Sequence, residues 1–392
     1  MLLFVLFGLT LLGIAVFHKH NLRIALLGAG AIASVRFHIG FHGETGWSGL
    51  GNHALHEWVS VTNIFLLIMG FELVSKYFEA SHLPVLIPKV LPDDWKGGLV
   101  LLAMVFTGSI FLDNIAAAMI GGAIATAVYR GKVSVGFVAA IVGCSNAGGA
   151  FSPIGDTTTT MMWISGVPPT DLLPAVFGSV TAFMVMSVIA SRQQQLHHPV
   201  IKDPPKEHRP LDMVYLGLVF LILGCMVTTN VIINKNFKSL AEVFPWVGVA
   251  VWAGILIASA IRTPHWVSLK GASKSALFLS MLILSASMMP IEELPRASTK
   301  VTFALGLWSA FFDNIPLAAL AIKQGGYKAA LLAYSVGFGG SITWFGSSAG
   351  VAICNDFPQA KSLWAWLKGG WFIFPAYVAG FLAIVAYTAI FG

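Results

Sequence analysis

The sequence Phe111-Leu112-Asp113-Asn114-Ile115 recurs in the second half of the chain as Phe311-Phe312-Asp313-Asn314-Ile315. Each copy lies between apolar segments and is followed by a glycine-rich interruption, at 146–149 and at 337–340. Irregular backbone within apolar segments persists only where it lines a cavity inside the protein, and paired interruptions are typical of transporters built from two repeats. The two copies therefore predict two repeats of one layout.

The composition indicates a protein that crosses a membrane several times. Hydrophobic residues make up 57% of the 392 residues and charged residues only 10%, against about 25% in soluble domains. The mean hydropathy is +0.81 and the apolar residues are spread along the chain, which excludes a soluble enzyme. The net charge of +6 does not indicate nucleic-acid binding, because the Lys and Arg residues lie in short connections between apolar segments.

A polar stretch over 192–210 divides the expected membrane segments into two halves. It contains three His and four Pro together with mixed charges, which is typical of an exposed linker. The first repeat is therefore predicted over 1–191, a cytoplasmic linker over 192–210 and the second repeat over 211–392. The expected apolar segments are 2–17, 22–37, 58–77, 98–112, 115–128, 134–144, 157–165, 172–190, 214–233, 243–261, 276–290, 301–312, 315–322 and 371–391.

The fold class predicted from this layout is an all-α polytopic membrane protein with two inverted-topology repeats. If each Asp-Asn segment is a re-entrant hairpin, each half has five net crossings, about ten in all, and the second half is inverted. Most Lys and Arg residues then lie on the face that carries 192–210, so this face is expected to be cytoplasmic and both termini external. The expected location is the inner membrane of a bacterium.

Three aspartates lie within or beside apolar segments. Asp113 and Asp313 are functional candidates, because an ionised carboxylate is costly in a membrane, although a role as a helix cap is the simpler alternative. Asp156 follows a stretch in which glycines and Pro153 interrupt regular helix, and four threonines follow it. The backbone carbonyls freed by this interruption, together with amide and hydroxyl side-chain oxygens, suit a hard cation such as Na⁺. The alternative is that the threonine hydroxyls bond back to their own helix.

The stretch SNAGGAFSPIGDTTTTMMWISG, residues 145–166, resembles the signature of NhaD-type sodium/proton antiporters. These antiporters belong to the ion transporter superfamily and are related to sodium-coupled dicarboxylate transporters. The similarity covers 55–390 and implies Asp-Asn pairs at hairpin tips, discontinuous helices and a homodimer. The resemblance places Na⁺ at Asp156, Asn146 and Asp113. The candidate ion- and proton-binding residues are Asp113, Asn114, Asn146, Asp156, Thr157, Thr158, Thr159, Asp313, Asn314, Ser341, Ser347 and Ser348.

Other polar and sulfur-containing residues are expected to be structural. Glu72 is either a proton-path residue or a side chain that reaches the interface near Lys76. Several histidines cluster around the predicted first external loop. We interpret them as part of a polar loop in preference to a pH sensor or a metal site. The residues of this cluster are His38, His42, His53, His56 and Glu57. The three cysteines, which lack metal-ligand spacing, are expected to pack in apolar surroundings; they are Cys144, Cys225 and Cys354.

The function predicted from these features is the exchange of Na⁺ (or Li⁺) for H⁺ by alternating access, without covalent chemistry or a cofactor. Its expected partners are the lipid bilayer, the transported ions and a second copy of the chain, not nucleic acid. The alternatives are sodium-coupled symport of an organic anion such as citrate or a dicarboxylate, and export of another cation or a metalloid. A scaffold without transport activity is disfavoured because the polar sites are present.

Overall fold

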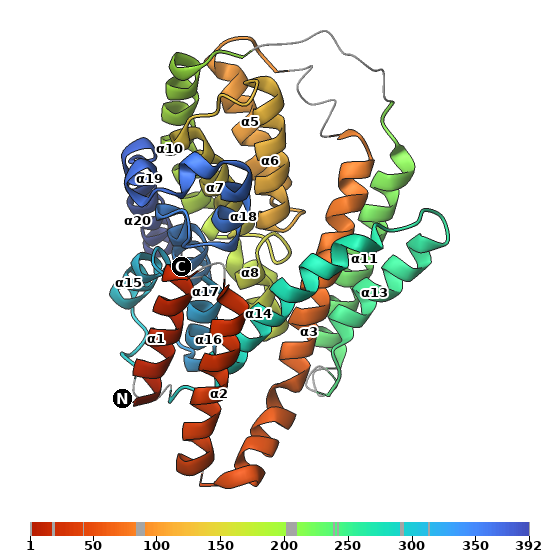
Figure 1. Cartoon of the computed structure of the whole chain (residues 1–392), viewed down its shortest axis with the longest axis vertical. Coiled ribbons are helices and arrows are strands. Elements are labelled where there is room, and N and C mark those ends of the chain that lie inside the picture. The colour runs from red at the N-terminus through yellow and green to blue at the C-terminus, as the bar shows by residue number, and fades with distance from the viewer. Residues whose placement is uncertain are drawn as a thin grey trace. The chain divides into compact units, whose positions relative to one another are not determined.

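The structure, a computed structural model, describes residues 2–17, 20–41, 43–83, 91–200, 210–237, 240, 243–290, 294–312 and 314–391 (Figure 1). Within these ranges the regular structure is helical, which confirms the all-α class, and Phe41 and Glu44 form an isolated bridge. The helices are α1 (Leu2–Val16), α2 (Asn21–Ile39), α3 (Gly46–Ala80), α5 (Trp95–Gly108), α6 (Asn114–Val128), α7 (Val135–Gly149), α8 (Thr157–Ile164), α9 (Pro169–Leu172), α10 (Ala175–His197), α11 (Met213–Asn236), α13 (Trp246–Ser259), α14 (Leu269–Ser287), α15 (Thr299–Ser309), α16 (Asn314–Gln324), α17 (Ala329–Gly339), α18 (Ser348–Asp356), α19 (Leu363–Gly369) and α20 (Ile373–Phe391). Short 3₁₀ segments are η3 (Trp266–Ser268), η5 (Gly340–Ile342) and η6 (Pro358–Lys361).

Polar side chains begin several of these helices by accepting a hydrogen bond from a backbone amide of the first turn. The capping residues, each with its donor, are Asp94 with Lys96 N, Ser134 with Phe137 N, Asp212 with Val214 N and Ser298 with Val301 N. Such caps satisfy amides that have no partner within the helix and contribute about 1 kcal/mol each. Local sequence therefore determines where these apolar helices start.

Six helical stretches of the described chain are long and apolar enough to cross a membrane. They are Asn21–Ile39, Gly46–Ala80, Pro169–His197, Met213–Asn230, Trp266–Ser287 and Ile373–Phe391. Helix α2 contains the expected segment 22–37 and extends it at both ends, so this segment is among the six. The chain is a multi-pass membrane protein.

The chain divides into two compact units, and each takes part of its sequence from either side of the predicted linker. One unit comprises Met1–Ser81 and Asp212–Leu294, and the other comprises His82–Leu211 and Pro295–Gly392. Helix α10 continues to His197, so the beginning of the stretch predicted as a linker is helical, whereas 201–209 lies outside the described residues.

The first unit is organised around α3, which packs against α2, α11, α13 and α14 (Figure 1). Its 35 residues span about 52 Å at 1.5 Å per residue, more than the ~30 Å hydrocarbon core, and it begins well before the expected segment 58–77. Buried polar side chains fix its packing: Asn63 Oδ1 accepts from Gly248 N at 2.9 Å, and Tyr77 donates to Arg262 O at 2.7 Å.

The histidine cluster lies largely on helices instead of a loop. His38 is on α2, His53 and His56 are on α3, and His42 lies outside the described residues. His53 Nε2 is 2.9 Å from Ser287 Oγ and the ring stacks on Phe41 at 4.2 Å between centroids. No group of three or more His, Cys, Asp or Glu side chains in the described part of the chain is arranged to hold a metal ion.

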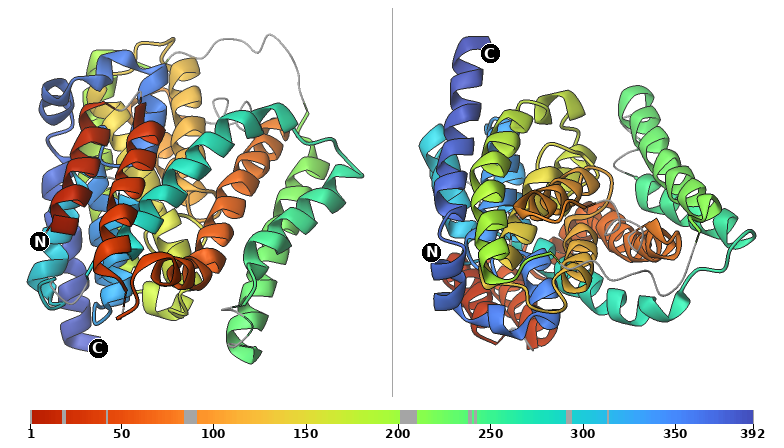
Figure 2. Two further views of the ribbon diagram at one scale, coloured as in Figure 1. Left: turned by 60° about the horizontal axis from the view of Figure 1, so that its bottom comes forward. Right: turned by 90° about the horizontal axis from the view of Figure 1, so that it is seen from above.

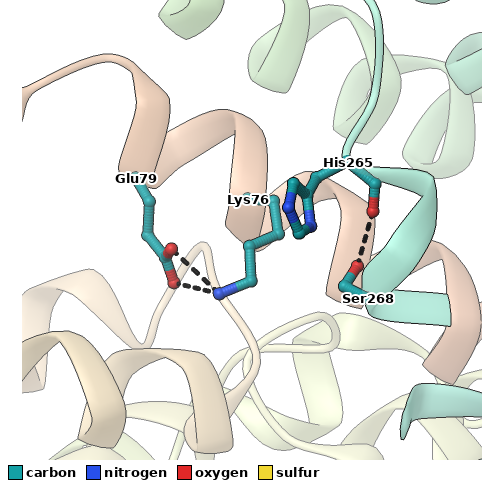
Figure 3. Close-up of polar contacts among 4 residues, drawn as sticks. All are labelled: Lys76, Glu79, His265 and Ser268. Carbon is teal, nitrogen blue, oxygen red and sulfur yellow. Dashed lines mark hydrogen bonds and ion pairs between the residues drawn. The ribbon is translucent and has the colours of Figure 1, made fainter. Parts of the chain in front are cut away.

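The other end of α3 carries an ion pair close to its C-terminus. Lys76 Nζ lies 2.9 Å from both carboxylate oxygens of Glu79, beside the turn in which Ser268 donates to His265 O (Figure 3). Glu72, one turn earlier and half-buried, is not the partner of Lys76. This part of the first unit is held together by local contacts.

The second unit is built around two buried helices, α7 and α17. Every residue from Gly136 to Gly149 is buried, as is every residue from Ala330 to Gly339. Helix α7 contacts α5, α6, α10 and α19, and α17 contacts α15, α16 and α20. Helices α10 and α20 run side by side at the periphery of this unit, as the view from above shows (Figure 2).

Both expected interruptions occur in this unit. Helices α5 and α6 form a hairpin that turns at 109–113, and α15 and α16 form a second hairpin. Residue 313 lies outside the described residues. Regular α-helix stops between α7 and α8, and again between α17 and α18. Each of these helices has 8 to 15 residues, about 12 to 22 Å, and is too short to cross the hydrocarbon core alone.

Candidate functional site

Five buried polar side chains meet where the first hairpin approaches both interrupted helices. We call Asn114, Asn146, Asp156, Ser341 and Ser347 the polar cluster, and each is at most 3% exposed. Asn114 Nδ2 donates to Asn146 Oδ1 at 2.9 Å and to Asp156 Oδ1 at 3.0 Å. Asn146 Nδ2 donates to Ser341 Oγ at 2.9 Å and to Ser347 Oγ at 3.1 Å. The cluster thus connects residues from both predicted repeats.

Helix starts bring these side chains together. Asn114 is the first residue of α6, Asp156 precedes α8, and Ser347 precedes α18. The amides of a helix start carry a partial positive charge, which favours negative charge beside them. Ser347 caps its own helix by accepting from Gly350 N, whereas the Asp156 carboxylate does not cap α8. Asp156 Oδ1 instead accepts from Asn114 Nδ2 within the cluster.

Asp113 occupies a different position from Asp156. Its carboxylate accepts from Ile115 N at 3.2 Å and caps α6, which is the simpler role considered for an aspartate next to a broken helix. It is half-buried and directly precedes Asn114, so its charge lies next to the cluster in sequence. Asp313, its counterpart in the second hairpin, lies outside the described residues.

The threonine run divides into two kinds of side chain. Thr159 donates to Ser152 O at 2.6 Å and to Asp156 O at 2.8 Å, and Thr160 donates to Pro153 O at 3.0 Å. These hydroxyls bond to carbonyls in and beside the interruption, and Asp156 O also accepts from Thr160 N at 2.9 Å. Thr158 is fully buried, and its hydroxyl has no hydrogen-bond partner within the described parts of the chain. Thr157 is half-buried at the start of α8.

The remaining candidates lie at the second hairpin and its interrupted helix. Asn314 is the first residue of α16 and is 2% exposed, and its Nδ2 has no hydrogen-bond partner among the residues that the structure describes. Ser348 is the half-buried first residue of α18. Helix α16 contacts α8, and α18 contacts α6, so each hairpin packs against the interrupted helix of the other half.

Matching hydrogen bonds tie each hairpin to an interrupted helix of its own half. The bonds, hydroxyl donor first, are Ser109 to Ser145 O (2.6 Å), Ser152 to Ile110 O (2.6 Å), Ser309 to Val336 O (2.7 Å) and Thr343 to Ala310 O. These donors were not predicted from the sequence. A signal was present for two of them, because a serine stands four positions before the aspartate in both copies of the repeated motif.

The segments that build the site carry no cationic side chain. Lys, Arg and His are absent from 97–129, 133–191, 301–322 and 329–360. A buried ionised carboxylate costs several kcal/mol unless a partner compensates it. The residues present, a carboxylate surrounded by amides and hydroxyls, provide oxygen ligands of the kind that hard cations take.

A multi-pass helical protein whose buried polar site lies at paired helix interruptions has the architecture of a membrane transporter. The chain belongs to the citrate transporter (CitMHS) family, which matches it over residues 4–339.

The chain is also similar to proteins named as antiporters, which confirms the resemblance noted above. It is 29% identical over 283 residues to sodium/proton antiporter 1 and 26% identical over 291 residues to sodium/proton antiporter 2, both of Arabidopsis thaliana. It is 27% identical over 293 residues to the Na⁺/H⁺ antiporter NhaD of Alkalimonas amylolytica. Each match covers 61 to 63% of this chain and 47, 66 and 58% of the respective relative, so the chain spans about half to two thirds of their length.

Proposed function

We propose that this protein exchanges Na⁺ (or Li⁺) for H⁺ across the membrane, and that both ions compete for the carboxylate of Asp156. The observation that carries the proposal is the position of this carboxylate. Asp156 is 1% exposed, its Oδ1 accepts a hydrogen bond from Asn114, and the segments around it contain no Lys, Arg or His. The names of the relatives support exchange of these two ions.

The physical reason for exchange is that the charge of a buried carboxylate needs to be compensated. A proton or a bound cation neutralises it, and either neutral form can then pass through the low-dielectric interior during alternating access. Deprotonation creates the cation site and cation binding prevents protonation, so the two ions cross in opposite directions. No covalent step and no cofactor are required.

Oxygen atoms near Asp156 complete the proposed cation site. Asn146 supplies an amide oxygen within the cluster, Thr158 a buried hydroxyl, and Asp113 a second negative charge beside Asn114. Oxygen ligands of this kind are those that hard cations prefer. Ser341 and Ser347 hold Asn146 in place through its Nδ2. Thr157, Thr159, Asp313, Asn314 and Ser348 remain proposed members of the wider site.

The proposed setting is the inner membrane of a bacterium, in which the chain forms a homodimer. About ten net crossings arise from two inverted repeats, with both termini external and the 192–210 stretch cytoplasmic. The distribution of Lys and Arg supports this orientation.

A second candidate, sodium-coupled uptake of an organic anion, is favoured by one observation. The family to which the chain belongs is described as that of a citrate transporter. A carboxylate substrate next to Asp156 would meet like charge, and the surrounding segments offer no Lys or Arg to bind it. Exchange is therefore the better supported function.

The test is cation-driven proton movement in proteoliposomes that contain the full chain and an internal pH dye. Na⁺, Li⁺ and K⁺ are added separately, and sodium-dependent uptake of labelled citrate is measured in parallel. Na⁺ or Li⁺ added outside enters in exchange for internal H⁺, so we expect either cation to alkalinise the lumen and Asp156→Asn to abolish the response. Asp171→Asn, a change at an exposed aspartate of the same unit, is the matched control. Citrate uptake without cation-driven proton movement would refute exchange and establish the second candidate.

A further inference from the structure

The matching contacts of the two interrupted helices align them residue by residue. Ser145 O accepts a hydrogen bond from Ser109 Oγ, and Val336 O accepts the equivalent bond from Ser309 Oγ. A β-carbon at Gly149 would lie 2.5 Å from Gly155 O, and one at Gly340 would lie 2.6 Å from Gly346 O. In this alignment Asn146 corresponds to residue 337 and Asp156 corresponds to residue 347. The polar residues of the first interrupted helix are thus replaced by Gly337 and Ser347.

Gly337 lies directly beside the carboxylate of Asp156. A β-carbon at Gly337 would be 3.1 Å from Asp156 Oδ2, and the next nearest atom, Ala150 Cβ, would be 3.9 Å away. Both Gly337 and Asp156 belong to the second unit, in which α17 packs against α7 and α8 (Figure 1). The absence of a side chain at 337 therefore leaves space on the α17 side of this oxygen.

We infer that Gly337 sets the size of the cation that can reach Asp156, an inference that rests on the exchange function proposed above. Oxygen ligands hold Ca²⁺, a hard cation close to Na⁺ in size, at roughly 2.3–2.6 Å. A methyl group at 337 would occupy the same side of Oδ2 at 3.1 Å, so a cation could not approach there. The packed interior can relax only slightly, because its density is near that of organic crystals. Because Na⁺ is larger than Li⁺, a methyl group at 337 should weaken the binding of Na⁺ more than the binding of Li⁺.

The experiment compares Gly337→Ala with the wild type in proteoliposomes, at one pH, with Na⁺ and Li⁺ titrated separately. We expect the apparent KM for Na⁺ to rise at least about tenfold, which corresponds to 1.4 kcal/mol, and the ratio of the Na⁺ to the Li⁺ KM to rise with it. Gly122→Ala is the matched control. Its β-carbon also meets neighbours at 3.1 Å, but these are apolar atoms of Ile353 and Phe357. It should keep the wild-type KM ratio.

The melting temperature of each purified variant separates a packing defect from a selectivity defect. An unchanged Na⁺/Li⁺ ratio in folded Gly337→Ala, or the same change in Gly122→Ala, would overturn the inference while exchange by the wild type stands. If Gly337→Ala does not fold, Ala150→Gly enlarges the same space, because Ala150 Cβ is the next nearest atom to a β-carbon at 337, and it should increase the response to K⁺. An unchanged K⁺ response then overturns the inference. A wild type that moves no protons with any cation refutes the exchange function, and the role of Gly337 falls with it.

Discussion

Asn114→Ala should weaken cation binding strongly, because the Asn114 amide links Asp156 to Asn146. Its amide donates two hydrogen bonds, at 2.9 and 3.0 Å, from a side chain that is 3% exposed. A hydrogen bond to a charged group contributes about 1.5–3 kcal/mol. A protonated Asp156 accepts a weaker bond, so most of this contribution belongs to the ionised, cation-binding form.

The magnitude follows from that difference. A loss of about 1.5–3 kcal/mol corresponds to a roughly 10- to 150-fold increase in the apparent KM for Na⁺. The assay is Na⁺-driven proton movement in proteoliposomes at fixed pH, with the melting temperature measured on the same preparation. Ser187→Ala on α10 is the control, because it removes a fully buried hydroxyl that makes no hydrogen bond to any described residue. A KM for Na⁺ within about twofold of the wild type in folded Asn114→Ala would refute the reasoning.

Three further predictions concern the surroundings of the cluster. Ser109→Ala and Ser309→Ala each remove a buried hydrogen bond of 2.6–2.7 Å, so each should lower the free energy of unfolding by about 1–3 kcal/mol without changing the Na⁺/Li⁺ KM ratio, as thermal unfolding and transport assays will show. Thr158→Val should raise the KM for Na⁺ without lowering the melting temperature, whereas Thr159→Val should lower the melting temperature because its hydroxyl bonds two backbone carbonyls; the reverse pattern would contradict the assignment. Lys76→Ala breaks a partly exposed ion pair and should change stability by less than about 1 kcal/mol, with transport kinetics unchanged; a larger loss in thermal unfolding would contradict this.

The interruptions of the fold could be predicted from the sequence because they have a direct chemical cause. Glycines and Pro153 stop regular helix, and the motif that contains Asp113-Asn114 occurs twice. Helix α3 was predicted too short, because its first turns contain polar residues and histidines that lower the local hydropathy although the backbone stays helical. The two compact units were not foreseen, since hydropathy indicates where segments lie in the chain and not which of them pack together.

The candidate site, like the fold, could be predicted from the sequence only in part. The type of residue indicated that Asn114, Asn146 and Asp156 would be polar sites in apolar surroundings, and the structure places them in mutual contact. Composition could not show which threonine hydroxyls are already used: Thr159 donates to backbone carbonyls, whereas Thr158 makes no hydrogen bond to any described residue. That distinction depends on where each side chain points, which a count of oxygen atoms does not contain.

The burial of the native thiols makes the chain well suited to chemical labelling. Cys144 and Cys354 are fully buried and Cys225 is half-buried, and all three are free. Because modification requires access to the thiol, impermeant maleimides should react slowly with the unaltered protein. Single cysteines introduced near either terminus would then report, in intact cells, which side of the membrane each end occupies, without first replacing the residues already present.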